Sequence, residues 1–436
     1  MTAEIAIMNP LAVALAADSA VTVTTGDRIG KIFNGANKIF ELSRGNPIGI
    51  MIYGNAALND VPWETVVKMY RKRLGTRRLD TTAAYARDFV SYIEKNRLVF
   101  PARAQRSFFS SRVGSYLNYV MKNIIDDIEA AIERDGRISE REIVQAVDVQ
   151  IKAEHARWSS APLAARMPTG HAKKITQVYA KEMRTAIKKQ FEDLPMSRSA
   201  VRRLHEIVGL MFERFPEGHN EPWLSGIVVA GFGELEIYPA VCSYEVTGIA
   251  ANRVHMRIAD EDAVAESQLA VIAPFAQRDM VSTFMEGVSP QYQAEVESCI
   301  AQLVELLPDA AIAELKTRMR VPGVHHEAVR EAMAGRRETT VETILDGLRD
   351  FRAAHTVDPV LRVVETLPIG ELAAMAETMI SLASFQKRVS MTDETVGGAS
   401  DVAVISKGDG FIWIRRKHYF EAGLNPRVAA AALKGE

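Results

Sequence analysis

Residues 1–20 read MTAEIAIMNPLAVALAADSA. The mostly apolar run over residues 4–17 is typical of buried β-structure, and it ends directly at an aspartate, Asp18. At the other end of the run, Thr2 follows the initiator methionine with no residue between them. A strand that closes on an aspartate, and a threonine directly behind the methionine, are the two features that a fold and a function must explain.

The same run imitates a secretion signal, because Ala14-Leu15-Ala16 resembles a small-residue cleavage site. Three features argue against that interpretation. No Lys or Arg precedes Arg28, Glu4 occupies the place of the usual positive charge, and Asn9-Pro10 interrupts the apolar run. We therefore expect a cytoplasmic protein that begins with this strand.

Composition limits the remaining classes. The 436 residues are 47% hydrophobic and 25% charged, which is the balance of a soluble globular protein with two or three packed units. With 53 basic and 55 acidic side chains, no overall charge draws the chain to nucleic acid or to an anionic membrane. No apolar stretch is long enough for a membrane span. Cys242 and Cys299 are too few for a disulfide framework and fit a reducing cytoplasm.

Strand-like and helical blocks alternate along the chain. Residues 3–60 predict strands, including the alternating Asn37–Leu42 and the apolar Ile48–Tyr53, with a turn at residues 44–47. Residues 61–222 predict four to six helices, one of which starts with a capping box of Ser139 and Glu142.

Strand character returns in the second half. We expect strands at residues 226–233 and 235–246, with Gly231–Glu234 as the hairpin turn between them, and a short apolar run at residues 269–275. Helices resume over residues 290–389. The last strands are expected at residues 401–406 and 411–415, joined by a hairpin at Lys407–Gly410.

Four segments, in this order, resemble the proteasome β-subunit branch of the N-terminal-nucleophile hydrolases. They are Thr2 behind the methionine with AADS (residues 16–19) at the family's distance from it, NKIFEL (37–42) as its lysine-bearing strand, IMIYG (50–54) as the strand ending in its oxyanion glycine, and DETVGG (393–398) as its late Asp-x-x-Ser-Gly-Gly turn. The resemblance covers under half of the chain and excludes both helical blocks.

The resemblance implies an α+β fold, a four-layer αββα sandwich of the N-terminal-nucleophile type with large helical insertions. It divides the chain into the first part of the core (2–60), a helical insertion (61–222), the second part of the core (223–289), a second insertion with core helices (290–367) and the C-terminal part of the core (368–436). Methionine aminopeptidase is expected to remove the methionine and leave threonine first.

The chemistry explains why the family places threonine there. A free α-amine has a reference pKa near 7.7, so an N-terminal Thr2 carries its own base for its hydroxyl. The resemblance makes Lys38 the neighbouring cation, Asp18 the carboxylate that holds Lys38, Gly54 the backbone oxyanion donor and Asp393 the support of the amine. The implied activity is a threonine peptidase or amidase that cleaves peptide or protein substrates without a cofactor.

Several positions depart from the family pattern. Ala20 stands where arginine usually follows Asp-Ser, Val396 replaces the serine of the late turn, and Phe275 lies where a Gly-Ser-Gly is expected. Two alternatives therefore stay open: a metabolic amidase acting on one small amide, and a scaffold of the same fold without catalysis. The resemblance also implies a ring-like homo-oligomer, and it leaves open whether an unfolding ATPase is a partner.

His325-His326 with Glu327 is the one grouping of residue types that suggests a metal site. Adjacent histidines point in different directions on any regular element, and no matching pair of ligands is evident in the sequence. We expect a solvated helix start there and no metal cofactor.

Overall fold

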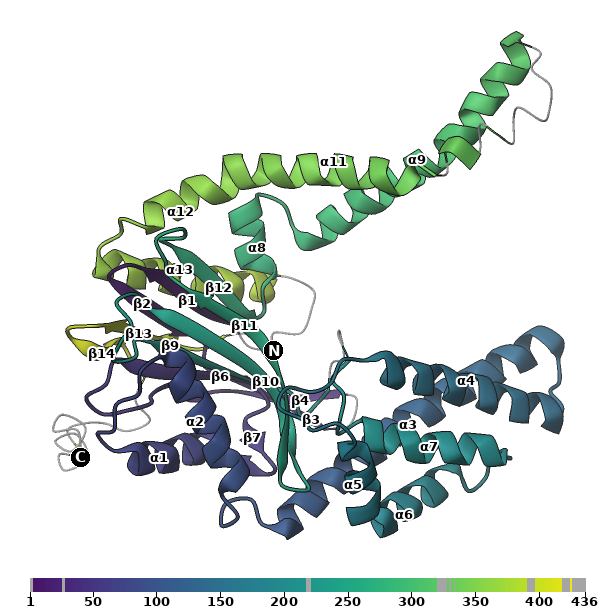
Figure 1. Cartoon of the computed structure of the whole chain (residues 1–436), viewed down its shortest axis with the longest axis horizontal. Coiled ribbons are helices and arrows are strands. Elements are labelled where there is room, and N and C mark those ends of the chain that lie inside the picture. Colours follow the sequence, from purple (N-terminus) through teal and green to yellow (C-terminus); the bar gives the residue numbers. More distant parts are fainter. Residues whose placement is uncertain are drawn as a thin grey trace.

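The computed structural model describes residues 3–25, 28–216, 221–319, 328, 331–333, 335–389, 397–417 and 424–425. Within these ranges the chain is an α+β protein built around two five-stranded antiparallel sheets (Figure 1). The candidate metal ligands His325, His326 and Glu327 lie outside the described ranges.

The first sheet contains the start of the chain, and we call it the N-terminal sheet. Its strands lie in the order β12 (Val271–Ala276), β1 (Ala3–Asn9), β2 (Ala12–Ala17), β13 (Asp401–Ser406) and β14 (Gly410–Arg415). Every residue of β1 and every residue of β2 is buried. Both strands are central and covered on both faces, which explains their nearly continuous apolar sequence.

The second sheet, which we call the central sheet, has the order β11 (Arg253–Ala263), β10 (Ala240–Ala250), β9 (Ser225–Gly231), β6 (Ile48–Gly54) and β5 (Ile39–Glu41). The chain also forms two small two-stranded sheets. One pairs β3 (Ala20–Thr25) with β4 (Arg28–Asn34), and the other pairs β7 (Ala57–Leu58) with β8 (Val61–Pro62). The predicted turn at residues 44–47 joins β5 to β6 and is confirmed.

The two sheets share one hydrophobic core. Met8 and Leu15 of the N-terminal sheet pack in one cluster with Met51 and Val228 of the central sheet. Because side chains alternate along a strand, the intervening residues face the other way. On β1 these are Ala3, Ile5 and Ile7, which pack with helices.

Helices cover the outer face of each sheet. The N-terminal sheet packs against α8 (Asp279–Glu286), α12 (Asp358–Val364) and α13 (Ile369–Val389). The central sheet packs against α1 (Trp63–Leu74) and α2 (Thr82–Lys95), whose buried residues Tyr70 and Phe89 meet edge to face. Among the described residues, no helix combines the length and apolar character that crossing a membrane requires.

Five further helices form a lobe with its own core, and we call it the helical lobe. They are α3 (Ala102–Asp135), α4 (Glu140–Ser160), α5 (His171–Val178), α6 (Ala180–Phe191) and α7 (Arg198–Leu210). The capping box of Ser139 and Glu142 is confirmed at the start of α4. The structure has seven helices, α1 to α7, in the block where four to six were predicted. The extra helix arises because only Tyr179 separates α5 from α6, so the apolar pattern continues from one helix into the next.

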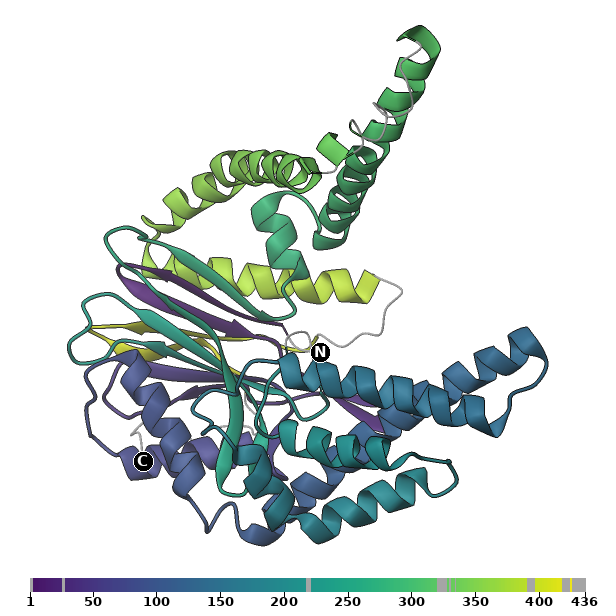
Figure 2. The same cartoon turned by 45° about the vertical axis from the view of Figure 1, so that its right-hand side comes forward.

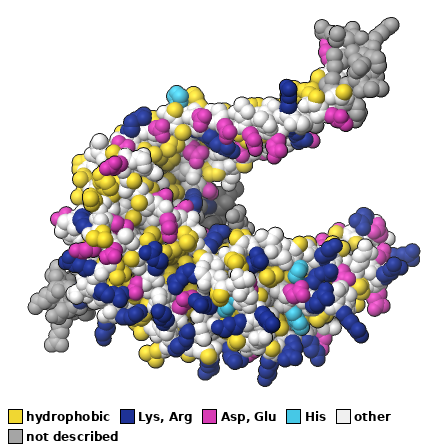
Figure 3. Space-filling model, viewed as in Figure 1, with side chains coloured by type: hydrophobic (Ala, Val, Ile, Leu, Met, Phe, Trp, Pro, Cys, Tyr) yellow, Lys and Arg dark blue, Asp and Glu magenta, His cyan; other side chains and the backbone are white. Residues whose placement is uncertain are grey.

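A long helical hairpin, which we call the arm, projects from the other side of the sheets (Figure 2). It consists of α9 (Pro290–Met319) and α11 (Arg337–Arg352), and a π-helical turn, η1 (Ala353–Val357), returns the chain to α12. The space-filling view shows a wide recess between the arm and the helical lobe (Figure 3). The N-terminal end of the chain lies at the inner end of this recess (Figure 1).

Two strand predictions in the second half need correction. The strand predicted at residues 235–246 is wrong at its start, because β10 begins at Ala240. The predicted tight turn at Gly231–Glu234 is also wrong, because the longer segment of residues 232–239 connects β9 to β10. Glu236 organises this connection by accepting hydrogen bonds from Gly233 N and Thr82 Oγ1. Strand β11 was not predicted. The closing hairpin of β13 and β14 is confirmed.

Candidate active site

Asp18 lies directly after β2, beside the first residue of β1. Its Oδ1 accepts hydrogen bonds from Ala3 N at 3.0 Å and from Lys38 Nζ at 2.6 Å. Its Oδ2 accepts from Ala20 N and Gly397 N, each at 3.1 Å. Only 1% of Asp18 is exposed. A buried carboxylate with this many donors is held in one orientation, so Asp18 fixes the start of β1, the lysine and a distant segment around one point.

Lys38 reaches this carboxylate from the residue that precedes β5. The side chain is 6% exposed, and its backbone oxygen accepts from Ile52 N of β6 at 2.9 Å, which anchors the lysine to the central sheet. Burial lowers the pKa of the Lys38 ammonium, while the carboxylates of Asp18 and Glu4 oppose that change. The ion pair between Lys38 and Asp18 therefore joins the two sheets at the start of the chain.

Gly397 and Gly398, the last two residues of the DETVGG segment, also lie next to Asp18 and Ser19. Gly397 donates its N–H to Asp18, and its carbonyl accepts from Ser19 N at 3.2 Å. Gly398 has a φ of +78°, and a Cβ placed on it would lie 2.5 Å from Ser19 Oγ. Glycine is therefore required at 398 by both backbone conformation and space.

Gly54 ends β6, the strand next to the one that Lys38 precedes. Its φ is +77°, and an added Cβ would lie 2.3 Å from Leu224 O. The residue before it, Tyr53, packs between the sheets and stacks on Phe275, with ring centroids 6.2 Å apart. Glycine at 54 is thus demanded by the close approach of the chain at Leu224. Its predicted role as an oxyanion donor is a separate matter and stays a prediction.

Thr2 and Asp393 lie outside the described residues, as does Val396. Of the five predicted site residues, the structure brings Asp18 and Lys38 into direct contact and places Gly54 on the strand beside them. Ala3, whose N–H is bonded to Asp18, is the residue that follows Thr2 in the sequence.

Two residues of this region, Glu4 and Gln277, were not predicted as site residues. Glu4 is 1% exposed, and neither of its carboxylate oxygens has a hydrogen-bond partner within the described ranges. Gln277 follows β12, whose Ala276 pairs with Ala3, and its buried Oε1 also lacks a partner among those residues. Glu4 could have been found as the one charged residue of β1. Gln277 carries no such signal.

Burial dominates the electrostatics of Glu4. It raises the pKa of this carboxyl to about 8, against the opposing effect of the Lys38 ammonium, and Asp18 raises it further. Ser19 Oγ, next to Asp18, is a further buried atom without a partner in the described part of the chain. Buried polar groups are normally hydrogen-bonded, so these atoms of Glu4, Gln277 and Ser19 are exceptions within the described ranges that call for an explanation.

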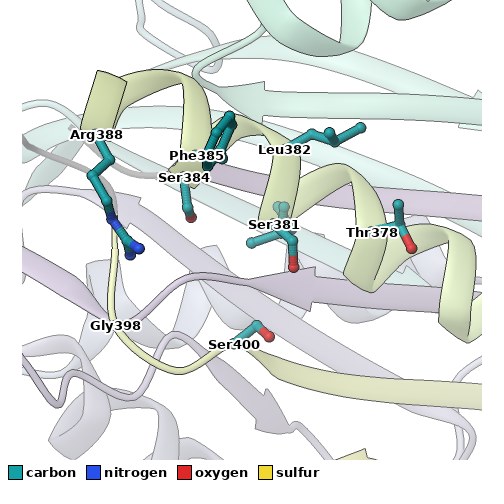
Figure 4. Close-up of a pocket in the computed structure, with 9 residues that line it drawn as sticks. Thr378, Ser381, Leu382, Ser384, Phe385, Arg388, Gly398 and Ser400 are labelled. Carbon is teal, nitrogen blue, oxygen red and sulfur yellow. The ribbon is translucent and has the colours of Figure 1, made fainter. Parts of the chain in front are cut away.

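A pocket of 460 Å³ opens beside this network (Figure 4). It lies between the last turns of α13 and the segment from Gly398 to Ser400, one residue from the Gly397 contact with Asp18. Four hydroxyls and one guanidinium supply its polar groups. The lining residues are Thr378, Ile380, Ser381, Leu382, Ser384, Phe385, Arg388, Gly398 and Ser400.

Within the described ranges, no three His, Cys, Asp or Glu side chains are grouped in a way that could hold a metal ion. No protein-family model matches this chain, and no curated protein matches it.

Proposed function

We propose that the chain is a threonine-type hydrolase of the N-terminal-nucleophile class that cleaves peptide or amide bonds. The observation that carries the proposal is the shared acceptor at Asp18 Oδ1, which receives both the Lys38 ammonium at 2.6 Å and the N–H of Ala3 at 3.0 Å. Because a peptide bond joins Ala3 to Thr2, this acceptor places a buried lysine near the residue that would act as nucleophile.

The arrangement of layers supports the same proposal. Two sheets share a core, α1 and α2 lie on one outer face, and α8, α12 and α13 lie on the other. We interpret this arrangement as the αββα sandwich of the class, with the helical lobe and the arm as additions to it.

In the proposed reaction, Thr2 Oγ attacks the carbonyl carbon while its proton passes to the α-amine. The C–N bond of the tetrahedral adduct then breaks, the amine returns the proton to the leaving nitrogen, and an ester to Thr2 remains. Water, deprotonated by the same amine, hydrolyses this ester and frees the hydroxyl. Lys38 favours the loss of protons from the amine and hydroxyl by its charge, and Asp18 orients it. The N–H of Gly54 is the proposed oxyanion donor.

Intact-mass analysis combined with covalent labelling tests the proposal. The mature chain is expected to lack the methionine, to carry an unmodified α-amine and to form one adduct with a threonine-directed peptide epoxyketone, mapped to Thr2. Thr2→Ala should abolish the adduct, and Thr2→Ser should retain it at a reduced rate. An acetylated amine, or an adduct that persists in Thr2→Ala, would contradict the proposal and leave the scaffold alternative.

A further inference from the structure

We propose that Glu4 is a third titrating member of the Asp18–Lys38 site, a positioning residue that keeps the site reactive by remaining protonated. The inference deepens the proposed function and rests on it. It starts from geometry: a carboxyl that is 1% exposed has no hydrogen-bond partner among the described residues, and it follows Ala3, whose N–H is bonded to Asp18.

Glu4 contributes nothing evident to stability. Burying a polar group without a hydrogen bond costs free energy, and burying an isolated carboxylate costs far more. Its neighbours on the paired strands, Ala17 and Phe275, are apolar and buried, so a valine or threonine would fit this position at lower cost. The other residues of β1 pack well, so the carboxyl of Glu4 points to a role in the proposed reaction beside Asp18 and Lys38.

Strand geometry relates this carboxyl to the nucleophile. Side chains two residues apart lie on the same face of a strand, roughly 6.6 Å apart along it. Glu4 shares its face with Ala6 and Met8, which pack between the two sheets. Thr2 stands two positions before Glu4 in the sequence, which is the spacing of side chains that share one face of a strand.

Charge balance sets the direction of the effect. The charged or titratable groups that interact electrostatically with Glu4 are Lys38 ahead of β5, Asp18 after β2 and Tyr53 on β6, whereas its partner on the neighbouring β12 is Phe275. With Glu4 protonated, one ammonium faces one carboxylate. When Glu4 ionises, a second negative charge enters the buried region without a second cation. That charge disfavours an anionic threonine oxygen and favours a protonated amine.

The consequence is a site that works while Glu4 is neutral. The rate of reaction at Thr2 should rise as the amine loses its proton and fall again as Glu4 ionises near pH 8. Glu4→Gln keeps the shape of the side chain and cannot ionise. This variant should therefore lose the falling limb, and at pH 9.5 it should react about tenfold faster than the native chain, relative to pH 7.5.

The experiment measures the labelling rate of Thr2 by a peptide epoxyketone from pH 6 to pH 10, by intact mass, in the native chain and in Glu4→Gln. Glu41→Gln is the matched control. Glu41 is a partly buried acid on β5 that pairs with Arg71 at 3.7 Å and lies outside the site. It should leave the falling limb in place. A Glu4→Gln profile identical to that of the native chain would overturn the inference.

A second measurement does not depend on hydrolysis. In protein labelled with ¹³C at the glutamate carboxyls, one signal that disappears in Glu4→Gln should titrate near pH 8. Lys38→Met should raise this midpoint, because it removes the cation that favours the ionised form, and Asp18→Asn should lower it.

The two measurements separate the two proposals. If no adduct forms at Thr2 at any pH, the hydrolase proposal fails, and the titration alone decides the role of Glu4. A signal near pH 8 that moves in either variant as expected supports the shared site, and the failure of one variant to fold leaves the other as the test. A Glu4 carboxyl that titrates near its ordinary value of 4.5, or that ignores both changes, overturns it.

Discussion

Asp18 is the residue on which the geometry of the candidate site depends, because four donors converge on it. Replacing it with asparagine puts an NH₂ group against two N–H donors and leaves the Lys38 ammonium buried without a countercharge. We expect Asp18→Asn to lower the free energy of unfolding by about 3–5 kcal/mol. Lys38→Met should cost less, about 2 kcal/mol, because three backbone donors still satisfy Asp18. Urea denaturation measures both.

A double variant tests whether the unpaired Lys38 charge causes the loss of stability in Asp18→Asn. The double variant Asp18→Asn, Lys38→Met removes both charges, and it should be more stable than Asp18→Asn alone. A double variant less stable than both single ones would show that the ion pair is not what holds this point together.

His255 on β11 gives a second prediction at the scale of one residue. Its Nε2–H donates to Arg214 O at 2.9 Å and its Nδ1 accepts from Thr247 Oγ1 at 2.8 Å, which satisfies a neutral ring. Burial, followed by the charge of Arg112, lowers its pKa to about 3. A lowered pKa means that the stabilising effect is fully present above the unfolded value of 6.5 and is lost as the pH falls towards 3.

We therefore expect the native chain to lose about 1 kcal/mol of stability for each pH unit below 6.5 through His255. His255→Asn should flatten this slope in a series of denaturation curves from pH 7 to pH 4. Part of the slope should remain, because burial lowers the pKa of His171 to about 4 and it acts in the same direction. An unchanged slope would contradict a buried, neutral His255.

At the scale of elements, two adjacent glycines offer a matched pair. Gly398 has a φ of +78°, and a Cβ would lie 2.5 Å from Ser19 Oγ, whereas nothing lies within 4 Å of a Cβ on Gly397. Gly398→Ala should destabilise the protein by more than about 1 kcal/mol and disturb the bond from Gly397 to Asp18. Gly397→Ala should be nearly neutral. Thermal denaturation of the two variants measures the difference, and equal effects would contradict the packing described for this segment.

A buried ion pair joins the helical lobe to the segment that leads into β9. Arg112 of α3 binds Glu221 through two hydrogen bonds, at 2.5 and 2.7 Å, and only 1% of its side chain is exposed. Arg112→Ala should cost about 3–5 kcal/mol, since Glu221 would keep a buried charge. Arg106→Ala on the same helix is the control. Its side chain is 53% exposed and pairs with Glu182, so its loss should cost less than about 1 kcal/mol.

The same elements show how far the sequence predicts this fold. The apolar run over residues 4–17 correctly predicted buried β-structure, but as a single strand, whereas the structure divides it at Pro10 and Leu11 into the antiparallel strands β1 and β2. Gly-containing turns correctly predicted β5 with β6 and β13 with β14. Strand β11 escaped because its second half, Arg257–Ala263, is mostly polar and partly exposed. Its turn is formed by Ala251 and Asn252, both with positive φ, and alanine gives no turn signal.

For the candidate site, the sequence predicted the contact of Asp18 with Lys38 through a resemblance to a family, because no local pattern links residues twenty positions apart on different sheets. Glu4 and Gln277 could not be identified in this way. Their importance comes from burial and missing partners, which depend on how β1 and β12 pair. Local patterns report faces and turns, whereas an unsatisfied buried atom is a property of the packed chain.

At the scale of the whole molecule, a wide recess separates the arm from the helical lobe (Figure 3), and the N-terminal end of the chain is marked at its inner end in the same view (Figure 1). Helices of the arm and of the helical lobe form the two walls of this recess. The ring-like homo-oligomer stays a prediction, which sedimentation analysis of the full chain would measure, and pull-down with the purified protein would decide whether an ATPase is a partner.

The arm is attached in a way that makes it removable. Among its described residues, α11 has none that are buried, and Ile312 is the only buried hydrophobic residue of α9. Its two ends are close together, because a Cβ on Gly287 would lie 3.6 Å from Thr356 Cγ2. Replacing residues 289–353 with a short Gly-Ser linker therefore removes almost no packing from the two sheets, and closing a short loop costs little free energy.

We expect this deletion to leave the thermal midpoint of the sheets within about 2 °C of the native value and the labelling of Thr2 by a small epoxyketone unchanged. Labelling by a bulky protein-linked probe should become faster, because one wall of the recess is gone. Deleting the helical lobe is the opposite case: its helix α3 holds the buried Arg112 pair, so that deletion should unfold the neighbouring strands. A large fall in the midpoint after removal of the arm alone would show that the arm is part of the core.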